Sequence, residues 1–139
     1  MQLKDIMTKQ VVTINGEDNV ADAAKRMLEA DIGCLVVTNA STIKGIITDR
    51  DLTIGCLSEG HNPRQCQVAH HMTSPVVTAS SATDVLEAAH LMTEKKIKRL
   101  PVTERGQLTG LVSFLDIAQA MEGPMHDLMI GMGAARRID

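Results

Sequence analysis

The chain alternates between two kinds of hydrophobic pattern, and each kind predicts a different secondary structure. A run of β-branched residues at Val11–Ile14 predicts a short strand. From Val20 to Leu28 the apolar residues recur at helical spacing, which predicts an amphipathic helix with one buried face. Two further apolar runs, Cys34–Thr38 and Ile43–Thr48, predict two strands. The turn residues Asn39–Ser41 between these strands indicate an antiparallel pair.

Polar residues and glycine mark the ends of the predicted elements. Asp18 or Asn19 can cap the first helix, and Gly33 is a stop signal after it. A second helix is expected from about Asp49 to Leu57. The order of elements is therefore β-α-β-β-α, which predicts an α+β fold.

The same pattern returns in the second half of the chain. Gly45–Asp51, with the sequence GIITDRD, aligns with Gly110–Asp116, with the sequence GLVSFLD. In the same register, Met7-Thr8 aligns with Met72-Thr73 without a gap. The chain is therefore expected to consist of two copies of one unit and a tail.

This repeat divides the chain into four parts. The first copy occupies residues 1–60, a linker 61–70, the second copy 71–123 and a C-terminal tail 124–139. One copy alone would bury too little surface to be comfortably stable. We therefore expect the two copies to share a core and to be related by a pseudo-twofold axis.

The repeated motif places a hydroxyl and a carboxylate at the end of a strand. Thr48 and Ser113 end their strands, and Asp51 and Asp116 follow one helical turn later. Both side chains should therefore point at one spot beyond the carboxyl end of the strand, where ligands of α/β layers commonly bind. The alternative is that the aspartates only complement the helix dipole.

Composition narrows the range of functions. Hydrophobic residues make up 44% of the 139 residues but aromatic residues only 1%, and Phe114 is the one aromatic ring. The net charge of −3 gives no general field for nucleic acid. No apolar run approaches the roughly 18 residues of a membrane helix, and the N-terminus lacks the apolar core of a signal peptide. We therefore expect a cytoplasmic protein that binds neither membranes nor nucleic acid.

The two motifs within two copies of the same element order resemble a pair of CBS domains, the regulatory domains named after cystathionine β-synthase. The resemblance covers about residues 1–122. It implies a Bateman module, in which tandem CBS motifs pair about a pseudo-twofold axis, and a flat homodimer. It also implies that an adenosine compound (AMP, ADP, ATP, S-adenosylmethionine or NAD) binds in clefts between the copies. Occupancy would then be transmitted to a separate, unknown partner.

The resemblance also assigns residues to two clefts. In each cleft the motif aspartate would bind the ribose hydroxyls, the Thr or Ser would lie near the phosphates, and the adenine would lie between aliphatic residues of the other copy. Cleft one would use Thr48, Asp49, Arg50 and Asp51, facing Pro75, Val77, Ile97 and Lys98. Cleft two would use Ser113, Phe114 and Asp116, facing Gln10, Val12, Ile32 and Gly33.

Charge predicts that the two clefts differ. Arg50 and Lys98 add positive charge near cleft one, whereas Leu115 and Gly33 stand at the matching positions near cleft two. A phosphorylated nucleotide should therefore prefer cleft one. For Arg50 a solvated position remains an alternative, and for Phe114 the alternative to stacking on a base is packing at the strand–helix junction.

No pattern typical of an enzyme is present. The sequence has no phosphate-binding loop of Walker type, no Gly-x-Gly-x-x-Gly and no nucleophile on a recognisable turn. We therefore expect a protein that is not an enzyme and requires no cofactor, with the adenine nucleotide as a regulatory ligand.

Histidines and cysteines gather around the linker. They are Cys56, His61, Cys66, His70 and His71. Their spacing matches none of the usual zinc patterns, so no metal site is predicted from it. A linker can still fold such residues together. The alternative function is therefore an interaction or stress protein that binds no nucleotide and holds a metal in the linker.

Overall fold

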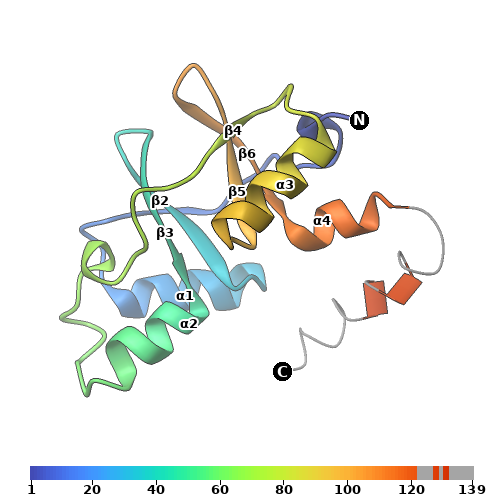
Figure 1. Ribbon diagram of the computed structural model, residues 1–139. Helices are drawn as coiled ribbons and strands as arrows, with labels where there is room; N and C mark the ends of the chain where they lie inside the picture. Colours follow the sequence, from blue (N-terminus) through green and yellow to red (C-terminus); the bar gives the residue numbers. More distant parts are fainter. Residues whose placement is uncertain (122–126, 129, 132–139) are drawn as a thin grey trace. The chain divides into compact units, whose positions relative to one another are not determined.

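The structure is a computed structural model that describes residues 1–121, 127, 128, 130 and 131. It contains two compact units (Figure 1). The N-terminal unit consists of Gln10–Val77 with Gly106–Leu108. The C-terminal unit consists of Met1–Lys9, Thr78–Arg105 and the chain from Thr109 onward. The predicted tail 124–139 lies almost entirely outside the described residues.

The N-terminal unit follows the predicted β-α-β-β-α order. Its elements are β1 (Thr13–Asn15), α1 (Val20–Ala30), β2 (Cys34–Asn39), β3 (Thr42–Thr48), α2 (Asp49–Asp51), η2 (Leu52–Leu57) and η3 (Val68–His70). Strand β2 lies in the middle of the sheet, parallel to β1 and antiparallel to β3. The predicted second helix has the expected extent, but η2, its last six residues, is wound as a π-helix.

The C-terminal unit repeats this order. Its elements are η1 (Leu3–Asp5), β4 (Ala79–Ser80), α3 (Val85–Lys95), β5 (Arg99–Glu104), β6 (Gln107–Ser113) and α4 (Phe114–Gln119). Strand β5 lies between β4 and β6 and is parallel to β4. The α+β fold of two repeated motifs is thus confirmed, each motif having one three-stranded sheet and its helices.

The ends of the first helix correct one prediction. Asn19 caps α1 by accepting a hydrogen bond from the Asp22 N–H at 2.8 Å, as one of the two predicted caps. The predicted stop at Gly33 is wrong, because α1 ends at Asp31, which adopts the left-handed conformation with φ of 55°. Lys96 ends α3 in the same way. A left-handed residue closes the helix by exposing its N–H to the last carbonyls, and that position need not be glycine.

The strands of each copy turn on two residues with positive φ. Ala40 and Ser41 occupy this turn in the N-terminal unit, and Arg105 and Gly106 occupy it in the C-terminal unit. Two consecutive positive φ angles match the twist of a two-residue hairpin. The predicted first strand is shifted: β1 begins at Thr13, two residues after the start of the β-branched run.

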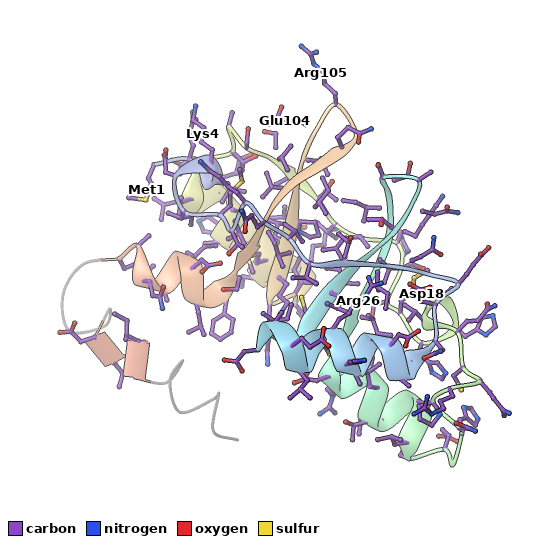
Figure 2. The ribbon with its side chains drawn as sticks, turned by 180° about the vertical axis from the view of Figure 1, so that it is seen from behind. Met1, Lys4, Asp18, Arg26, Glu104 and Arg105 are labelled. Atoms are coloured by element: carbon purple, nitrogen blue, oxygen red, sulfur yellow. The ribbon has the colours of Figure 1, made fainter. Side chains whose placement is uncertain are left out.

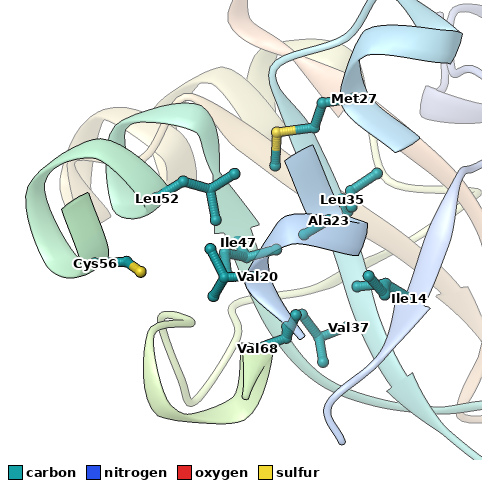
Figure 3. Close-up of a cluster of buried hydrophobic side chains, with 10 residues drawn as sticks. All are labelled: Ile14, Val20, Ala23, Met27, Leu35, Val37, Ile47, Leu52, Cys56 and Val68. Atoms are coloured by element: carbon teal, nitrogen blue, oxygen red, sulfur yellow. The ribbon is translucent and has the colours of Figure 1, made fainter. Parts of the chain in front are cut away.

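The core of the N-terminal unit lies between α1 and the sheet (Figure 3). Val20, Ala23 and Met27 form the buried face of α1, as their helical spacing predicts. They pack against Leu35 and Val37 of the central strand. Leu28, expected on the same face, is 81% exposed. In the C-terminal unit Val85, Ala88 and Met92 bury the matching face of α3.

The compact units exchange the opening segments of the two sequence repeats. Thr8, in the first repeat, forms a bridge with Leu111 of the C-terminal unit. Thr73, at the matching position of the second repeat, forms the same bridge with Ile46 of the N-terminal unit. Each third strand therefore pairs with the Met-Thr segment of the other repeat, which the alignment of the repeats alone does not predict.

Polar contacts on the surface tie helix to strand and strand to strand. Arg26 on α1 lies 3.7 Å from Asp18 and donates to the Thr13 carbonyl at 2.6 Å (Figure 2). In the C-terminal unit the Glu104 carboxylate accepts hydrogen bonds from the Ser81 hydroxyl and, at 2.8 Å, from the Ser81 N–H. Among the described residues, no helix is long and apolar enough to cross a membrane.

Candidate ligand-binding site

The first motif forms a capping box where β3 becomes α2. The Asp51 N–H donates to Thr48 Oγ1 at 3.1 Å, and the Thr48 N–H donates to Asp51 Oδ2 at 2.9 Å. These reciprocal bonds satisfy two backbone donors that the start of a helix leaves unpaired. The Thr48 and Asp51 side chains therefore hold the start of α2.

The second motif has the same geometry. The Asp116 N–H donates to Ser113 Oγ at 3.1 Å, and the Ser113 N–H donates to Asp116 Oδ2 at 2.8 Å. Both aspartates are half-buried. Among the described residues, the Oδ1 atoms of Asp51 and Asp116 have no hydrogen-bond partner. One oxygen of each carboxylate thus remains available to a donor from a ligand.

The glycine that opens each motif makes room for a methionine. A Cβ atom at Gly45 would lie 2.6 Å from Met72 Sδ and 2.8 Å from the Thr73 carbonyl oxygen. At Gly110 a Cβ atom would overlap the side chain of Met7. These methionines come from the exchanged opening segments. Glycine, threonine or serine, and aspartate therefore each have a structural role in the motif.

Each unit brings its motif beside the loop that precedes its central strand. The Asp49 N–H donates to the Gly33 carbonyl at 2.9 Å, and the Phe114 N–H donates to the Lys98 carbonyl at 2.9 Å. Gly33 leaves space there, because a Cβ at this position would lie 3.0 Å from Asp49 Oδ2. Residues assigned to different clefts are thus neighbours within one unit: Asp49 with Gly33, and Phe114 with Lys98.

The predicted residues at this end of each sheet are accessible. In the N-terminal unit Gln10, Asp49, Arg50 and Pro75 are exposed, Ile32 is 39% exposed, and Val12, Gly33, Thr48 and Val77 are partly buried. In the C-terminal unit Lys98 and Phe114 are exposed, and Ile97 and Ser113 are partly buried. A contact of these side chains with a ligand would therefore require no rearrangement of a buried core.

A hollow of about 370 Å³ lies in the C-terminal unit between α3 and α4. It contains three of the predicted residues, Ile97, Lys98 and Phe114. The other lining residues are Ala89, Met92, Thr93, Lys96 and Ile117. The ring of Phe114 faces this hollow and is 36% exposed, so it is only partly used in packing.

The linker brings together three of the five histidines and cysteines considered above. The ligand atoms of Cys56, Cys66 and His71 all lie within 4.8 Å of one another, in the part of the chain that the structure describes. His61 stands close by, with its ring centre 5.9 Å from that of His71. His70 is exposed and is not part of this group. Burial, followed by the hydrogen bond and charge of Cys66, raises the pKa of the Cys56 thiol.

The sequence model of the CBS-domain family matches this chain at residues 3–55 and 68–123. The chain belongs to the CBS-domain family. Each matched segment contains one complete Gly-x-x-Thr/Ser-x-x-Asp motif. The resemblance to a pair of CBS domains seen in the sequence is therefore confirmed. CBS domains are regulatory modules, and the relatives described next are CBS-domain proteins.

Similar proteins share most of the length of this CBS-domain protein. CBS domain-containing protein YhcV of Bacillus subtilis is 30% identical and covers 84% of this chain and 82% of its own. A crystal structure of a CBS-domain-containing protein from Agrobacterium tumefaciens superposes with a TM-score of 0.78 at 30% identity, covering 86% of this chain and 98% of its own.

A third similar structure contains metal. The crystal structure of Hypoxic Response Protein I with two coordinated zinc ions superposes with a TM-score of 0.79 at 27% identity. It covers 88% of this chain and 100% of its own. Hypoxic response protein 1 of Mycobacterium tuberculosis is 28% identical to this chain.

Proposed function

We propose that this CBS-domain protein is a regulatory module that binds an adenine nucleotide through its repeated motif. The observation that carries the proposal is the half-buried aspartate that follows each third strand. One of its carboxylate oxygens is engaged in the helix cap, and the other has no hydrogen-bond partner among the described residues. A carboxylate only accepts hydrogen bonds, and each of the two ribose hydroxyls can donate one.

The proposed ligand contacts follow the cleft assignment made from the sequence. Asp51 binds the ribose and Arg50 binds the phosphates in cleft one. The Arg50 side chain is exposed and has no ion-pair partner among the described residues. Asp116 binds a ribose in cleft two, where the position that matches Arg50 is Leu115. Cleft one therefore favours AMP, ADP or ATP over a neutral nucleoside.

Regulation follows by linkage. A ligand that binds one arrangement of the module better than another shifts the population toward it, and a partner protein then responds to that shift. At a free ligand concentration 100 times Kd, the bound state gains about 2.7 kcal/mol. This gain is enough to shift a balanced two-state equilibrium strongly toward the bound arrangement.

A homodimer and a cytoplasmic location stay predictions. The homodimer is supported by apolar side chains exposed on helices of both units: Leu28 is 81% exposed, Leu86 64% and Ile54 52%. A second copy would cover such surface. A separate regulated partner and the absence of catalytic activity likewise stay predictions.

The proposal is tested by calorimetric titration with AMP, ADP, ATP, NAD and S-adenosylmethionine. The informative variant is Asp51→Asn, because an amide oxygen still accepts from the Thr48 N–H and keeps the cap, while the charge and the second acceptor are lost. We expect nucleotide affinity to fall about 10- to 100-fold, the equivalent of a charged hydrogen bond of about 1.5–3 kcal/mol.

Asp116→Asn is the matched control. It should leave the affinity for AMP nearly unchanged if cleft one is the phosphate-binding site. Unchanged affinity in Asp51→Asn would refute the ribose assignment, and two equal, independent AMP sites in the unaltered protein would refute the asymmetry between the clefts.

A further inference from the structure

The linker cluster has the composition of a metal site. Two thiols and an imidazole, from Cys56, Cys66 and His71, place their ligand atoms within 4.8 Å of one another. Sulfur and imidazole donors in a set of this kind suit zinc. Zinc–sulfur bonds of about 2.3 Å and zinc–nitrogen bonds of about 2.0–2.1 Å place ligand atoms roughly 3.5–4 Å apart around one ion. Small side-chain rotations would therefore close the group around a cation.

Cys56 is held in place by the π-helix and by the linker. Its side chain is fully buried near the end of η2 and belongs to the same core cluster as Leu52 and Val68 (Figure 3). The His61 N–H donates to the Cys56 carbonyl at 3.1 Å, and Cys56 Sγ lies 3.8 Å from the His61 carbonyl oxygen. A π-helical segment inside a helix is rare and is frequently found at functional sites.

The other two residues are held by backbone hydrogen bonds. The Val20 N–H donates to the Cys66 carbonyl at 2.9 Å, which fixes Cys66 against the start of α1. The Val68 N–H donates to the Asp18 carbonyl at 2.8 Å, and the His71 N–H donates to the Val68 carbonyl at 3.0 Å. Three short segments in and beside the linker are thus anchored around one point before any ligand binds.

Gly55 provides the space for the imidazole. A Cβ atom at this position would lie 3.1 Å from His71 Nδ1. The ring of His71 therefore packs directly on the backbone of η2, one residue before Cys56. Any side chain at position 55 would push the ring away from the two sulfur atoms.

His61 is positioned to supply a fourth ligand. Two imidazoles on one tetrahedral zinc ion have ring centres about 5 Å apart, given zinc–nitrogen bonds of about 2.0–2.1 Å. The rings of His61 and His71 are 5.9 Å apart and tilted by 57°. His61 is exposed, so its ring can turn inward without disturbing the core.

We propose that Cys56, Cys66 and His71, with His61 as the fourth ligand, bind one zinc ion in a tetrahedral site that fastens the linker to η2 within the N-terminal unit. Zinc binds as the dication and the two thiols bind it as thiolates, so two protons are released to solvent and the charges balance. The burial that disfavours a thiolate at Cys56 in the metal-free protein is offset by the charge of the ion. The site is separate from the motif aspartates and needs no nucleotide.

The test uses the full chain, kept reduced with a phosphine and stripped of metal with a chelator. Zinc is then titrated in competition with a chromogenic chelator, and bound zinc is measured by elemental analysis. We expect one zinc ion per chain and an increase in melting temperature. Cobalt(II) in place of zinc should give the intense d–d bands of a tetrahedral ion and a thiolate charge-transfer band in the near ultraviolet.

Matched variants locate the ligands. Cys66→Ser and His71→Ala should each weaken zinc binding at least about 100-fold, since the outer-shell partners of metal ligands alone account for about 10- to 100-fold. His70→Ala, at the adjacent exposed histidine, should bind zinc like the unaltered protein. Gly55→Ala should weaken binding about tenfold although all four donors remain, because the added methyl displaces the His71 ring.

Circular dichroism of each metal-free variant establishes that it is folded. Failure of the reduced, folded protein to take up zinc would overturn the proposal, as would zinc binding that Cys66→Ser and His71→Ala leave unchanged. Formation of a Cys56–Cys66 disulfide with no metal uptake after reduction would assign the two thiols to redox chemistry instead. Because no nucleotide is added, these outcomes are independent of the nucleotide titration.

Discussion

The two copies of the motif have the same capping geometry and differ in the residues around it. The aspartate carboxylate lies 2.9 Å from the Thr48 nitrogen in one copy and 2.8 Å from the Ser113 nitrogen in the other. Between the capping residues, however, the first copy has Arg50 where the second has Leu115. The shared residues build the fold, and the residues that differ distinguish what each copy can bind.

The helices that follow the two motifs differ as well. In the N-terminal unit α2 continues into a π-helix that carries Gly55 and Cys56 to the linker. In the C-terminal unit α4 ends at Gln119, and Ala120 and Met121 stand at the positions that match Gly55 and Cys56. Only the first copy therefore presents a thiol beside an imidazole among the described residues.

The largest difference in stability is expected at the two motif glycines. Gly45→Ala should lower the free energy of unfolding by about 3 kcal/mol, because the new methyl group meets the rigid Thr73 carbonyl as well as Met72. Gly110→Ala should cost less, about 1–2 kcal/mol, because the three nearest atoms that it meets all belong to the side chain of Met7, which can move. Urea denaturation measures both.

Double-mutant cycles sharpen this comparison. Removing the methionine with Met7→Ala should relieve most of the Gly110→Ala penalty, whereas Met72→Ala should relieve only part of the Gly45→Ala penalty. Equal relief at the two sites would show that the Thr73 backbone yields, and that the two copies are packed alike.

A smaller and equal effect is expected at the two helix caps. Thr48→Ala and Ser113→Ala should each lower the free energy of unfolding by about 1 kcal/mol, because each leaves the aspartate N–H without its acceptor. Thr48→Ser keeps the hydroxyl and serves as the control. Costs that differ by more than about 1 kcal/mol between the copies would contradict the equivalence of the two caps.

The smallest effect depends on pH and belongs to the C-terminal unit alone. Hydrogen bonds from Ser81, followed by the nearby charges of Arg105 and Lys4, hold the pKa of Glu104 below its ordinary value. The matching positions in the first copy are Gly16 and Asn39. A lowered pKa means that the carboxylate stabilises the fold above the ordinary glutamate pKa. This stabilisation is lost as the pH falls through the lowered pKa.

Glu104→Gln should therefore be slightly less stable than the unaltered protein at neutral pH, and the difference should vanish in acid. Ser81→Ala should produce the same convergence. Thermal melts at a series of pH values measure it. A difference that persists unchanged below the glutamate pKa would mean that packing, and not charge, accounts for the effect.

Much of the fold could be predicted because its determinants are local. The helical spacing of Val20, Ala23 and Met27 predicts the buried face of α1, and a polar residue before that stretch predicts its cap. The recurrence of GIITDRD as GLVSFLD predicts that the second unit repeats the first. The stop at Gly33 was wrong because the left-handed position that closes α1 is taken by Asp31, and aspartate can adopt this conformation without being glycine.

Local pattern by itself determined the order of the elements, the repeated motif and the membership of the CBS family, since each depends on residues close in the chain. Only the tertiary structure decided which opening segment pairs with which third strand, why glycine must face Met72 or Met7, and that Cys56, Cys66 and His71 meet. The first two features join residues that are distant in the sequence, and the third depends on the linker being held against the distant start of α1. Contacts of that kind depend on the path of the whole chain, and no local spacing records it.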